Sequence, residues 1–452
     1  MTAAARETDK YLLGIVIFLA MCIGGGTRSG LMTDFILEAV TILVCSRILA
    51  KPGAVPVSGT AAVLISAALA AMILQLVPLP SGLLVWARNP PVTEAMERSG
   101  SPIAFMTLGF SYTLRSLLVF LSLSLFFLAV SRLRSDQVVG LAPFFLVGVL
   151  CNILAGAIQF SSADQVVIDD LLPYRITAGF FANINHFSSL LFVTIPFLVY
   201  YGVIRGNMKV AACGMVVVML MLLAAGSRAG IGIGFGIMVA SIVLLSSRSR
   251  FGIGALLVLF AALSIYSMGA WTRFEADKTN SNSLRLEFIE TTWDGIKDNW
   301  LTGTGYGNFE QAYPIYEKPE HIFRYFVNHA HNEYVQLVFE GGILAALLIA
   351  AYLVLLHVQF WRVRADAFRK VAYLGTLFLL LHSLVDYPLR TFALLVPFVF
   401  FNAILFYSGT FPKKQVQARI GDIEIDDGSN LVPADRTPQK THRRDLLMRP
   451  QR

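Results

Sequence analysis

Long apolar runs recur along most of the chain and are separated by short polar connections. A helix that crosses a membrane needs roughly 20 consecutive apolar residues. A sliding window of about 19 residues finds about twelve such runs. They cover residues 11–26, 31–49, 59–77, 112–131, 138–160, 186–204, 208–226, 229–246, 251–271, 333–359, 369–386 and 391–408. The pattern predicts an all-α polytopic membrane protein with about twelve transmembrane helices in residues 1–408.

Three polar segments between these runs are long enough to form structure outside a membrane. Residues 78–111 contain Trp86 and proline-containing turns, which predict short interfacial helices. Residues 161–185 are polar with an aromatic end, and residues 272–332 form the largest extramembrane loop. The tail at 409–452 has few large apolar residues and mixed charges, so it is predicted to be disordered.

Basic residues in the short connections indicate the orientation, because Lys and Arg are enriched in cytoplasmic loops. With the N-terminus inside, each inner connection carries at least two of them. An even number of spans then places both termini in the cytoplasm and the loop at 272–332 on the opposite side. The apolar run after Arg6 and Lys10 lacks a small-residue cleavage site, so we expect it to remain as the first span. The inner basic residues are Arg47, Lys51, Arg132, Arg134, Arg205, Lys209, Arg248, Arg250, Arg362, Arg364, Arg369, Lys370, Lys413 and Lys414.

Composition agrees with a lipid environment. The chain is 56% hydrophobic and 14% charged, whereas soluble domains carry roughly 25% charged residues. The net charge of +7 is spread between the apolar runs and the tail, where topology explains it, and we find no nucleic-acid-binding motif. The cysteines lie inside apolar runs, at no metal-ligand or redox spacing, and are expected to be small buried hydrophobes. They are Cys22, Cys45, Cys151 and Cys213.

Several arginines lie on the predicted outer side, each close to a membrane boundary. Their position opposes the orientation signal and costs insertion energy, so an attractive interaction should offset it. An anionic ligand would do so, and internal salt bridges would do so equally well. These residues are Arg175, Arg228, Arg285, Arg324 and Arg390.

The segment Asn-His-Ala-His-Asn-Glu-Tyr at 328–334 runs directly into the tenth predicted span. Imidazole transfers protons near neutral pH, and the first turn of a helix attracts anions, so His331 is a candidate base. The alternative is a capping cluster with Asn332 as the N-cap. A metal site is not expected, because His329 and His331 are two apart and no cysteine or glutamate completes a standard spacing.

Residues 283–300 have apolar positions at three- to five-residue intervals, which predict an amphipathic helix. Arg285 lies in its first turn, where the helix dipole disfavours a cation. A phosphate ligand would explain this position, and so would an ion pair with Glu287 or Glu290. The apolar positions are Leu284, Phe288, Trp293, Ile296 and Trp300.

Four other segments carry polar groups on the same predicted side. Gly-Thr-Gly-Tyr-Gly-Asn-Phe at 303–309 is a turn and not a Walker loop, because no Gly-Lys-Ser/Thr follows. Gly-Ser-Arg-Ala-Gly at 226–230 places Arg228 between two apolar runs, where an arginine is a functional candidate. Asn-Ile-Asn-His at 183–186 precedes the sixth predicted span. In the connection at 382–390, Asp386 and Arg390 could pair with each other or hold a ligand.

Together these segments resemble the O-antigen ligase and O-antigen polymerase superfamily of bacterial membrane glycosyltransferases. The resemblance rests on the order of these motifs and on their common side more than on any single motif. It covers roughly residues 170–400. The matching segments are Ser-Arg-Ala-Gly at 227–230, the helix from Arg285 to Trp293, Gly-x-Gly-x-Gly-Asn-Phe at 303–309, His-Ala-His-Asn-Glu-Tyr at 329–334, Glu-Gly-Gly at 340–342, Asn-x-Asn at 183–185 and Val-Asp-Tyr-Pro-Leu-Arg at 385–390.

The resemblance implies a GT-C-like helical fold in the bacterial inner membrane, with the large loop and the site facing the periplasm. It also implies a donor glycan on undecaprenyl pyrophosphate, a glycan or lipid acceptor, and transfer without a metal or other cofactor. Arg228 and Arg285 would bind the pyrophosphate, and His331 would activate the acceptor hydroxyl as a base. Further substrate contacts are expected from His329, Asn332, Asn185, Arg390 and Arg175.

We therefore expect an inverting transferase that polymerises a surface or extracellular polysaccharide, because the segment at 385–390 resembles exopolysaccharide polymerases. The alternative function, a ligase that transfers the glycan to lipid A core or to a protein, remains open. A lipid-linked glycan transporter would show internal repeats and polar residues at the bilayer midplane, whereas the polar residues here gather on one face. A scaffold protein without activity would tolerate loss of His331 and Arg285.

Overall fold

The computed structural model describes residues 3–86, 88, 90, 92–161, 172–245, 284–319, 326–411, 423–425 and 431–433. The chain divides into two units, Met1–Pro412 and Lys413–Arg452. The described part of the first unit is mainly helical. In the second unit, β3 (Ile423–Ile425) pairs antiparallel with β4 (Leu431–Pro433). The expected disorder of the tail stays a prediction.

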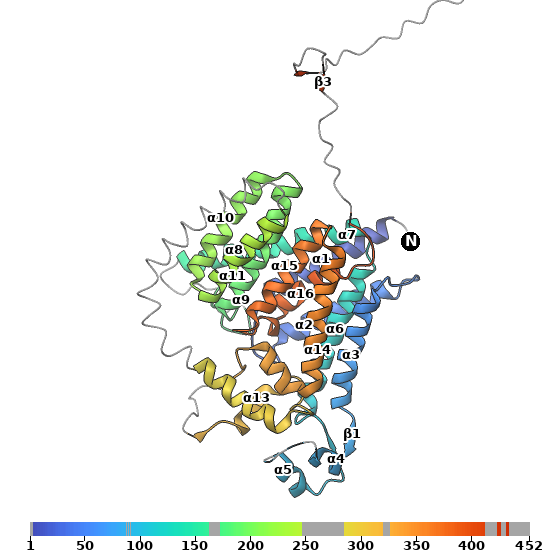
Figure 1. The fold of residues 1–452 in the computed structure, drawn as a ribbon, viewed down its shortest axis with the longest axis vertical. Helices are drawn as coiled ribbons and strands as arrows, with labels where there is room; N and C mark the ends of the chain where they lie inside the picture. Colours follow the sequence, from blue (N-terminus) through green and yellow to red (C-terminus); the bar gives the residue numbers. More distant parts are fainter. Residues whose placement is uncertain are drawn as a thin grey trace, which may run out of the picture. The chain divides into compact units, whose positions relative to one another are not determined.

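The first half of the helical unit contains long helices and one small segment of short helices and strands (Figure 1). β1 pairs antiparallel with β2 and closes the segment that holds the short helices α4 and α5. The short helices expected at 78–111 are present, together with a strand pair that the pattern did not indicate. The elements are α1 (Ala3–Ile23), α2 (Met32–Leu49), α3 (Gly59–Gln75), β1 (Pro78–Pro80), α4 (Ser81–Trp86), α5 (Val92–Ser99), β2 (Ile103–Phe105), α6 (Phe110–Ser131), α7 (Ser135–Val139) and α8 (Ala142–Ser161).

The second half supplies the remaining bundle helices and the described part of the large loop. The predicted amphipathic helix is present at 284–299, and short helical turns follow it. The elements are α9 (Ile184–Val199) with the π-helical turn η2 (Tyr200–Ile204), α10 (Met208–Ala225), α11 (Arg228–Leu245), α13 (Phe309–Ala312), η3 (Tyr313–Ile315), α14 (Glu333–Val363), α15 (Ala367–His382), η5 (Pro388–Arg390) and α16 (Phe392–Leu405).

Within the described residues, six helices are long and apolar enough to cross a membrane. They are Phe110–Ser131, Ser135–Ser161, Ile184–Ile204, Met208–Ala225, Arg228–Leu245 and Glu333–Val363. The chain is therefore a mainly helical membrane protein, whereas the expected count of about twelve spans is not established. α3 and α16 are apolar but shorter, α1 and α2 carry charged residues, and α15 has 16 residues. The expected span at 251–271 lies outside the described residues.

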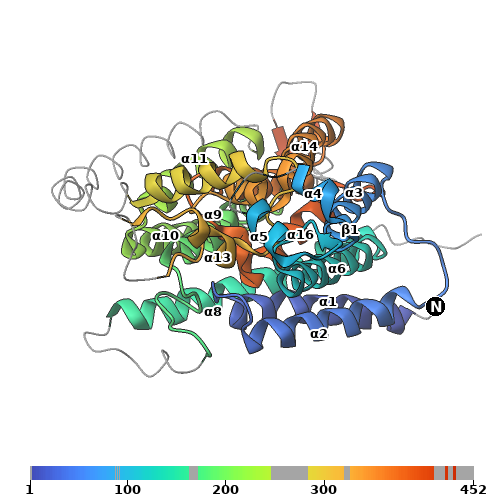
Figure 2. The ribbon, with the colours of Figure 1, turned by 90° about the horizontal axis from the view of Figure 1, so that it is seen from below.

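α9 is the best enclosed of the six helices: 78% of its apolar window is buried, against 17% for α14. It packs against α8, α10, α11 and α15. Phe197 on α9 contacts Phe145 on α8 and Phe401 on α16, with ring centroids 5.1 and 5.6 Å apart. α1, α2 and α8 lie along one side of the bundle (Figure 2). α9 thus anchors the polar residues at its N-terminal end to the core.

The long helix α14 is interrupted near its start. Gly342 has φ 59° and ψ −149°, which is not helical. Where a helix is interrupted, the carbonyl groups of the turn before the break lose the N–H groups that would otherwise donate to them from four residues later. The glycine-rich loop supplies those partners, since Thr304 N donates to Phe339 O at 2.9 Å and Gly305 N donates to Glu340 O at 2.8 Å. The interpretation of this loop as a turn is confirmed, and the turn docks the large loop onto α14.

The helix at 284–299 also packs onto the start of α14. Phe288 and Ile296 contact an apolar cluster that includes Phe339 of α14. Trp293 and Trp300 were expected on the same apolar side, but they are 54% and 55% exposed. The expectation was wrong because Trp293 lies roughly 140° around the helix from Phe288. The buried side orients the first turn, which carries Arg285, toward the end of α9.

We predict that Gly342→Ala destabilises the protein, whereas Gly232→Ala does not. A Cβ on Gly342 would lie 2.7 Å from the backbone oxygen of Leu301, and its φ of +59° disfavours an L-residue. Such strain costs of order 1–3 kcal/mol. Gly232 in α11 has ordinary backbone angles and open space around it. Thermal unfolding of both variants in lipid nanodiscs measures the difference, and equal transition temperatures would contradict the strain argument.

Candidate active site

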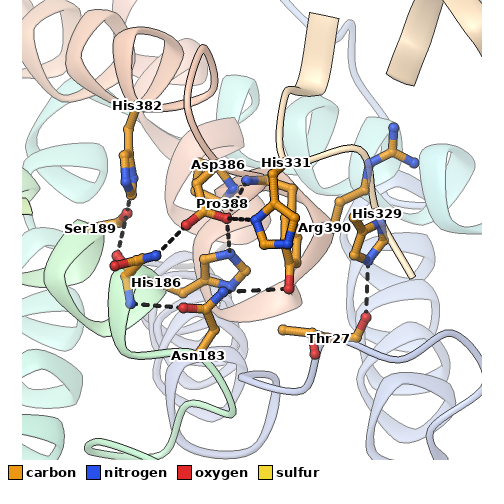
Figure 3. A network of polar contacts seen from close by, with 12 residues as sticks. Thr27, Asn183, His186, Ser189, His329, His331, His382, Asp386, Pro388 and Arg390 are labelled. Atoms are coloured by element: carbon orange, nitrogen blue, oxygen red, sulfur yellow. Dashed lines mark hydrogen bonds and ion pairs between the residues drawn. The ribbon is translucent and has the colours of Figure 1, made fainter. Parts of the chain in front are cut away.

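Two polar connections meet near the N-terminal end of α9. Residues 326–332 lead into α14, and residues 383–391 join α15 to α16. They are tied together because Glu333 N donates to Ser383 O at 2.9 Å. Figure 3 shows their side chains converging with those at the start of α9. Residues far apart in the sequence thereby form one polar cluster.

Asp386 lies at the centre of this cluster and is 1% exposed. Its Oδ1 faces two imidazoles, with His331 Nδ1 at 3.4 Å and His186 Nε2 at 3.8 Å (Figure 3). Its Oδ2 accepts a hydrogen bond from Asn185 Nδ2 and lies 3.8 Å from a guanidinium nitrogen of Arg285. A buried carboxylate is costly unless it is paired and hydrogen-bonded. Both of its oxygens meet that condition here.

These partners keep Asp386 ionised. Burial by itself raises the pKa of the Asp386 carboxyl, but the imidazoles of His186 and His331 outweigh that effect and hold its pKa well below the usual range. The carboxylate is therefore negative at physiological pH.

His331 is held in an uncommon backbone conformation. Among the described residues, His331 is the only non-glycine residue with a positive φ angle, which is 53°. This left-handed conformation is disfavoured for L-residues and persists where the surroundings determine it. The ring stacks on Phe288 at 6.0 Å and meets the edge of Tyr387 at 4.8 Å. The side chain stays 21% exposed, so the imidazole is accessible while its carboxylate partner is not.

His329, two residues earlier, is buried and has both ring nitrogens occupied. Its Nε2 lies 3.1 Å from Thr27 O, and its Nδ1 lies 3.2 Å from Gln336 Nε2. Since a carbonyl can only accept, Nε2 carries the hydrogen and Nδ1 accepts from the amide. Burial and the nearby Arg390 charge lower the pKa of His329 to about 3. The arrangement fits a neutral structural histidine better than the substrate contact expected from the sequence.

Arg390 does not form the ion pair with Asp386 that the sequence allowed. Its Nε lies 3.0 Å from Glu333 Oε2, and its Nη1 lies 3.2 Å from both carboxylate oxygens of Glu340. Leu389 N also donates to Glu333 Oε1 at 2.9 Å. These contacts fasten η5 to α14 and so hold the connection that carries Asp386 against the one that carries His331. Two carboxylates already neutralise Arg390.

The start of α11, where Arg228 lies, is linked to the cluster through Ser227 and Asn185. Ser227 Oγ donates to Asn185 Oδ1 at 2.7 Å and accepts from Gly230 N at 3.1 Å. The Asn185 amide donates to Asp386, so it links the start of α11 to the central carboxylate. Arg228 is the first residue of α11 and is half-buried.

Two further predicted site residues are Asn332 and Arg175. Asn332 is the N-cap of α14, since its Oδ1 accepts from Tyr334 N at 3.0 Å and Val335 N at 3.1 Å. Arg175 is exposed in the segment before α9, so its proposed substrate contact stays a prediction. The outer arginine Arg324 lies outside the described residues.

The sequence did not identify Asp386 as the centre or His186 as its second imidazole. His186 is fully buried and meets the edge of Tyr387 at a centroid distance of 4.8 Å. Both residues stood in segments that the sequence had singled out, at 183–186 and 382–390. The lone carboxylate in the connection at 382–390 was the available signal, but nothing in the chain indicated its partners. Among the described residues, no group of three or more His, Cys, Asp or Glu side chains is arranged to hold a metal ion.

Comparison with known families finds a match that covers part of this cluster. Residues 213–350 match the family described as O-antigen ligase. The matched segment includes Arg228, Arg285 and His331, whereas Asn185 and Asp386 lie outside it. No curated protein matches the chain.

We predict that the stability of the His329→Gln variant falls less on lowering the pH than the stability of the wild type does. The folded pKa of about 3 lies below the ordinary 6.5, so between these values the folded state binds fewer protons than the unfolded state. Stability is therefore lost as pH falls through this window, by at most about 1.4 kcal/mol per pH unit. Gln can keep the donation to Thr27 without titrating.

Thermal unfolding between pH 7 and pH 4.5 measures this effect. The wild type should lose a few degrees more than His329→Gln over that range. His357→Gln, which changes an exposed histidine of α14, should follow the wild-type curve. Parallel curves for all three proteins would show that His329 does not stay neutral on folding.

Proposed function

We propose, from the match of residues 213–350 to the O-antigen ligase family, that the chain is an inverting membrane glycosyltransferase that moves a lipid-linked glycan onto an acceptor hydroxyl. The observation that supports this most directly is the accessible imidazole of His331 against the buried carboxylate of Asp386, 3.4 Å away. Arg285 beside them supplies a cation for an anionic substrate. The three groups come from three different parts of the chain.

His331 is the proposed general base. If Asp386 accepts from the protonated Nδ1, Nε2 is left to accept a proton. The acceptor hydroxyl gives this proton to Nε2 as its oxygen attacks the anomeric carbon. Asp386 then stabilises the imidazolium that forms. Because attack and departure occur on opposite faces of the sugar, one displacement inverts the anomeric configuration.

The leaving group in this proposal is the diphosphate of undecaprenyl pyrophosphate. As the glycosidic bond breaks, its electron pair goes to the diphosphate oxygen, and guanidinium groups can stabilise that charge. Arg285 is one-third exposed and has donors beyond those near Asp386. Arg228 at the start of α11 is the second proposed contact, where the helix dipole also favours an anion. We propose that these two arginines take the role that a metal ion has in other transferases.

We further propose that the product is a surface or extracellular polysaccharide and that the site faces the periplasm from the inner membrane, with both termini cytoplasmic. The resemblance of the segment at 385–390 to exopolysaccharide polymerases favours polymerisation over ligation. Asp386 within that segment lies at the centre of the cluster. A transporter is disfavoured because the described polar cluster lies at one end of the bundle, where helices begin and end.

We predict that Asp386→Asn lowers kcat by about 10²–10⁴-fold, because the amide can stabilise the wrong tautomer of the base. His331→Ala should abolish transfer. The double variant should be no slower than His331→Ala alone, since the two groups act as a unit. Initial rates of glycan transfer from a lipid-linked donor in proteoliposomes measure all three.

His357→Ala serves as the matched control, because this exposed histidine of α14 lies away from the cluster. It should retain wild-type turnover. Equal thermal stability of all variants shows that they are folded. Full activity in His331→Ala at normal expression, or additive losses in the double variant, would contradict the proposed base.

We predict that Arg228→Lys lowers kcat/KM for the donor about tenfold or more, because lysine keeps the charge but loses the paired donors of the guanidinium. Arg98→Lys on α5, where the side chain is 77% exposed, is the control for the same substitution. Unchanged kinetics in Arg228→Lys would indicate that Arg228 contributes packing alone.

A further inference from the structure

Tyr387 contacts three of the histidine rings near the central carboxylate. It follows Asp386 in the connection between α15 and α16 and is 5% exposed. The ring centroid of Tyr387 lies 4.2 Å from that of His329 and 4.8 Å from those of His186 and His331. Figure 3 shows these three imidazoles in one group beside Asp386. The proposed mechanism uses one of them as the base but gives Tyr387 no part.

The phenol of Tyr387 is tied to the neighbouring connections. Asn183 Nδ2 donates to the Tyr387 hydroxyl at 3.4 Å, and the side chains of Asn328 and Thr27 also hydrogen-bond with it. Burial raises the pKa of Tyr387 to about 12, so the phenol keeps its proton at neutral pH. An enclosed, protonated phenol does not act as a base. Any part of Tyr387 in the reaction is therefore exerted through the rings that it contacts.

Hydrogen bonds do not fix the orientation of the His331 ring. Its Nδ1 has no hydrogen-bond partner among the described residues, and the 3.4 Å to Asp386 Oδ1 exceeds the usual N–H···O distance, as is common before substrate binds. The torsion that turns a histidine ring is broad and roughly two-fold. A half-turn would place a carbon atom where Nδ1 faces the carboxylate. Ring contacts must therefore select the orientation.

Two aromatic rings make those contacts with His331. Tyr387 meets the imidazole at an interplanar angle of 77°, and Phe288 lies across it at 27°. Aromatic pairs prefer such defined geometries. Phe288 is on the helix at 284–299, whereas Tyr387 is adjacent to Asp386 in the chain, so Tyr387 relates the imidazole directly to the carboxylate.

The backbone of Tyr387 is also held next to that carboxylate. Its N–H donates to Asp386 Oδ1 at 2.9 Å, which is the oxygen that faces His331. Pro388 follows and begins η5, which Arg390 fastens to α14. Because the bond to Asp386 comes from the backbone, a change of the Tyr387 side chain leaves it in place and tests the ring alone.

We propose that Tyr387 is a positioning residue: its ring holds the His331 imidazole with Nδ1 toward Asp386, which leaves Nε2 toward the acceptor hydroxyl. The buried rings of His186 and His329 hold Tyr387 in turn. The inference rests on the proposed transferase function and adds the group that orients its base.

Initial rates of glycan transfer in proteoliposomes test the ring. Tyr387→Leu should lower kcat about 10²-fold, because a misplacement of about 1 Å can cost that much, and should leave the KM for the lipid-linked donor unchanged. Tyr387→Phe keeps the ring and should keep kcat near the wild-type value. Tyr407→Leu is the matched control, since Tyr407 is 8% exposed and follows the opposite end of α16. It should lower thermal stability but keep kcat.

Chemical rescue separates the orientation of the ring from the stability of the protein. In His331→Gly, glycine adopts the φ of 53° without strain and leaves space beside Tyr387 and Phe288. Free imidazole should bind there and restore transfer in a saturable way. Adding Tyr387→Leu to this variant should raise the imidazole concentration for half-maximal rescue about tenfold. Adding Tyr407→Leu should not change it.

Four results would overturn the proposal. The first is wild-type kcat in folded Tyr387→Leu, and the second is a kcat for Tyr387→Phe as low as that for Tyr387→Leu. The third is equal half-maximal rescue with and without the Tyr387 ring. The fourth is no rescue of His331→Gly at any imidazole concentration, because the surroundings would then not hold an imidazole.

Modification by diethyl pyrocarbonate separates this inference from the proposed function, because it requires no turnover. Mass spectrometry measures the rate of acylation at each histidine. His329 and His331 should react several-fold faster in Tyr387→Leu than in the wild type, whereas the exposed His357 of α14 should react equally in both. If the wild type transfers glycans and Tyr387→Leu keeps its kcat, the positioning role is wrong and the function stands. If the wild type transfers nothing while acylation is faster in the variant, the function is wrong and Tyr387 still holds the rings.

Discussion

The burial of one carboxylate determines the arrangement of the site. Asp386 is almost fully enclosed, and an unpaired charge in such a position would cost several kcal/mol. Its oxygens are therefore met by side chains from α9, from the helix at 284–299 and from the segment before α14. Because each of these groups comes from a different part of the chain, the need to pair one charge brings the candidate catalytic residues together.

Two structural devices hold those parts in place. Arg390 pairs with Glu333 and Glu340, so the connection after α15 is fastened to α14. The break in α14 at Gly342 frees carbonyl groups that bind the glycine-rich loop. Both devices act on the first turns of α14, next to His331. The left-handed backbone at His331 is held by its neighbours, since Ala330 N donates to Gln336 Oε1 and Asn332 Nδ2 donates to Leu384 O.

The surroundings of the site differ on its two sides. The start of α11 and the helix at 284–299 present arginines, whereas the cavity between α3, α6, α14 and α16 presents both arginines and carboxylates above an apolar wall.

The sequence alone determined what depends on neighbours along the chain. Apolar runs indicated a helical membrane protein, Asn332 indicated where α14 begins, and spacing indicated the helix that carries Arg285. These features follow from hydrogen bonding and periodicity within a few residues. The tertiary structure alone decided which polar groups are paired: Arg390 with two glutamates, His329 with two structural partners, and Asp386 with His331. Pairing depends on distances between residues that are far apart in the chain, and a single sequence does not contain those distances.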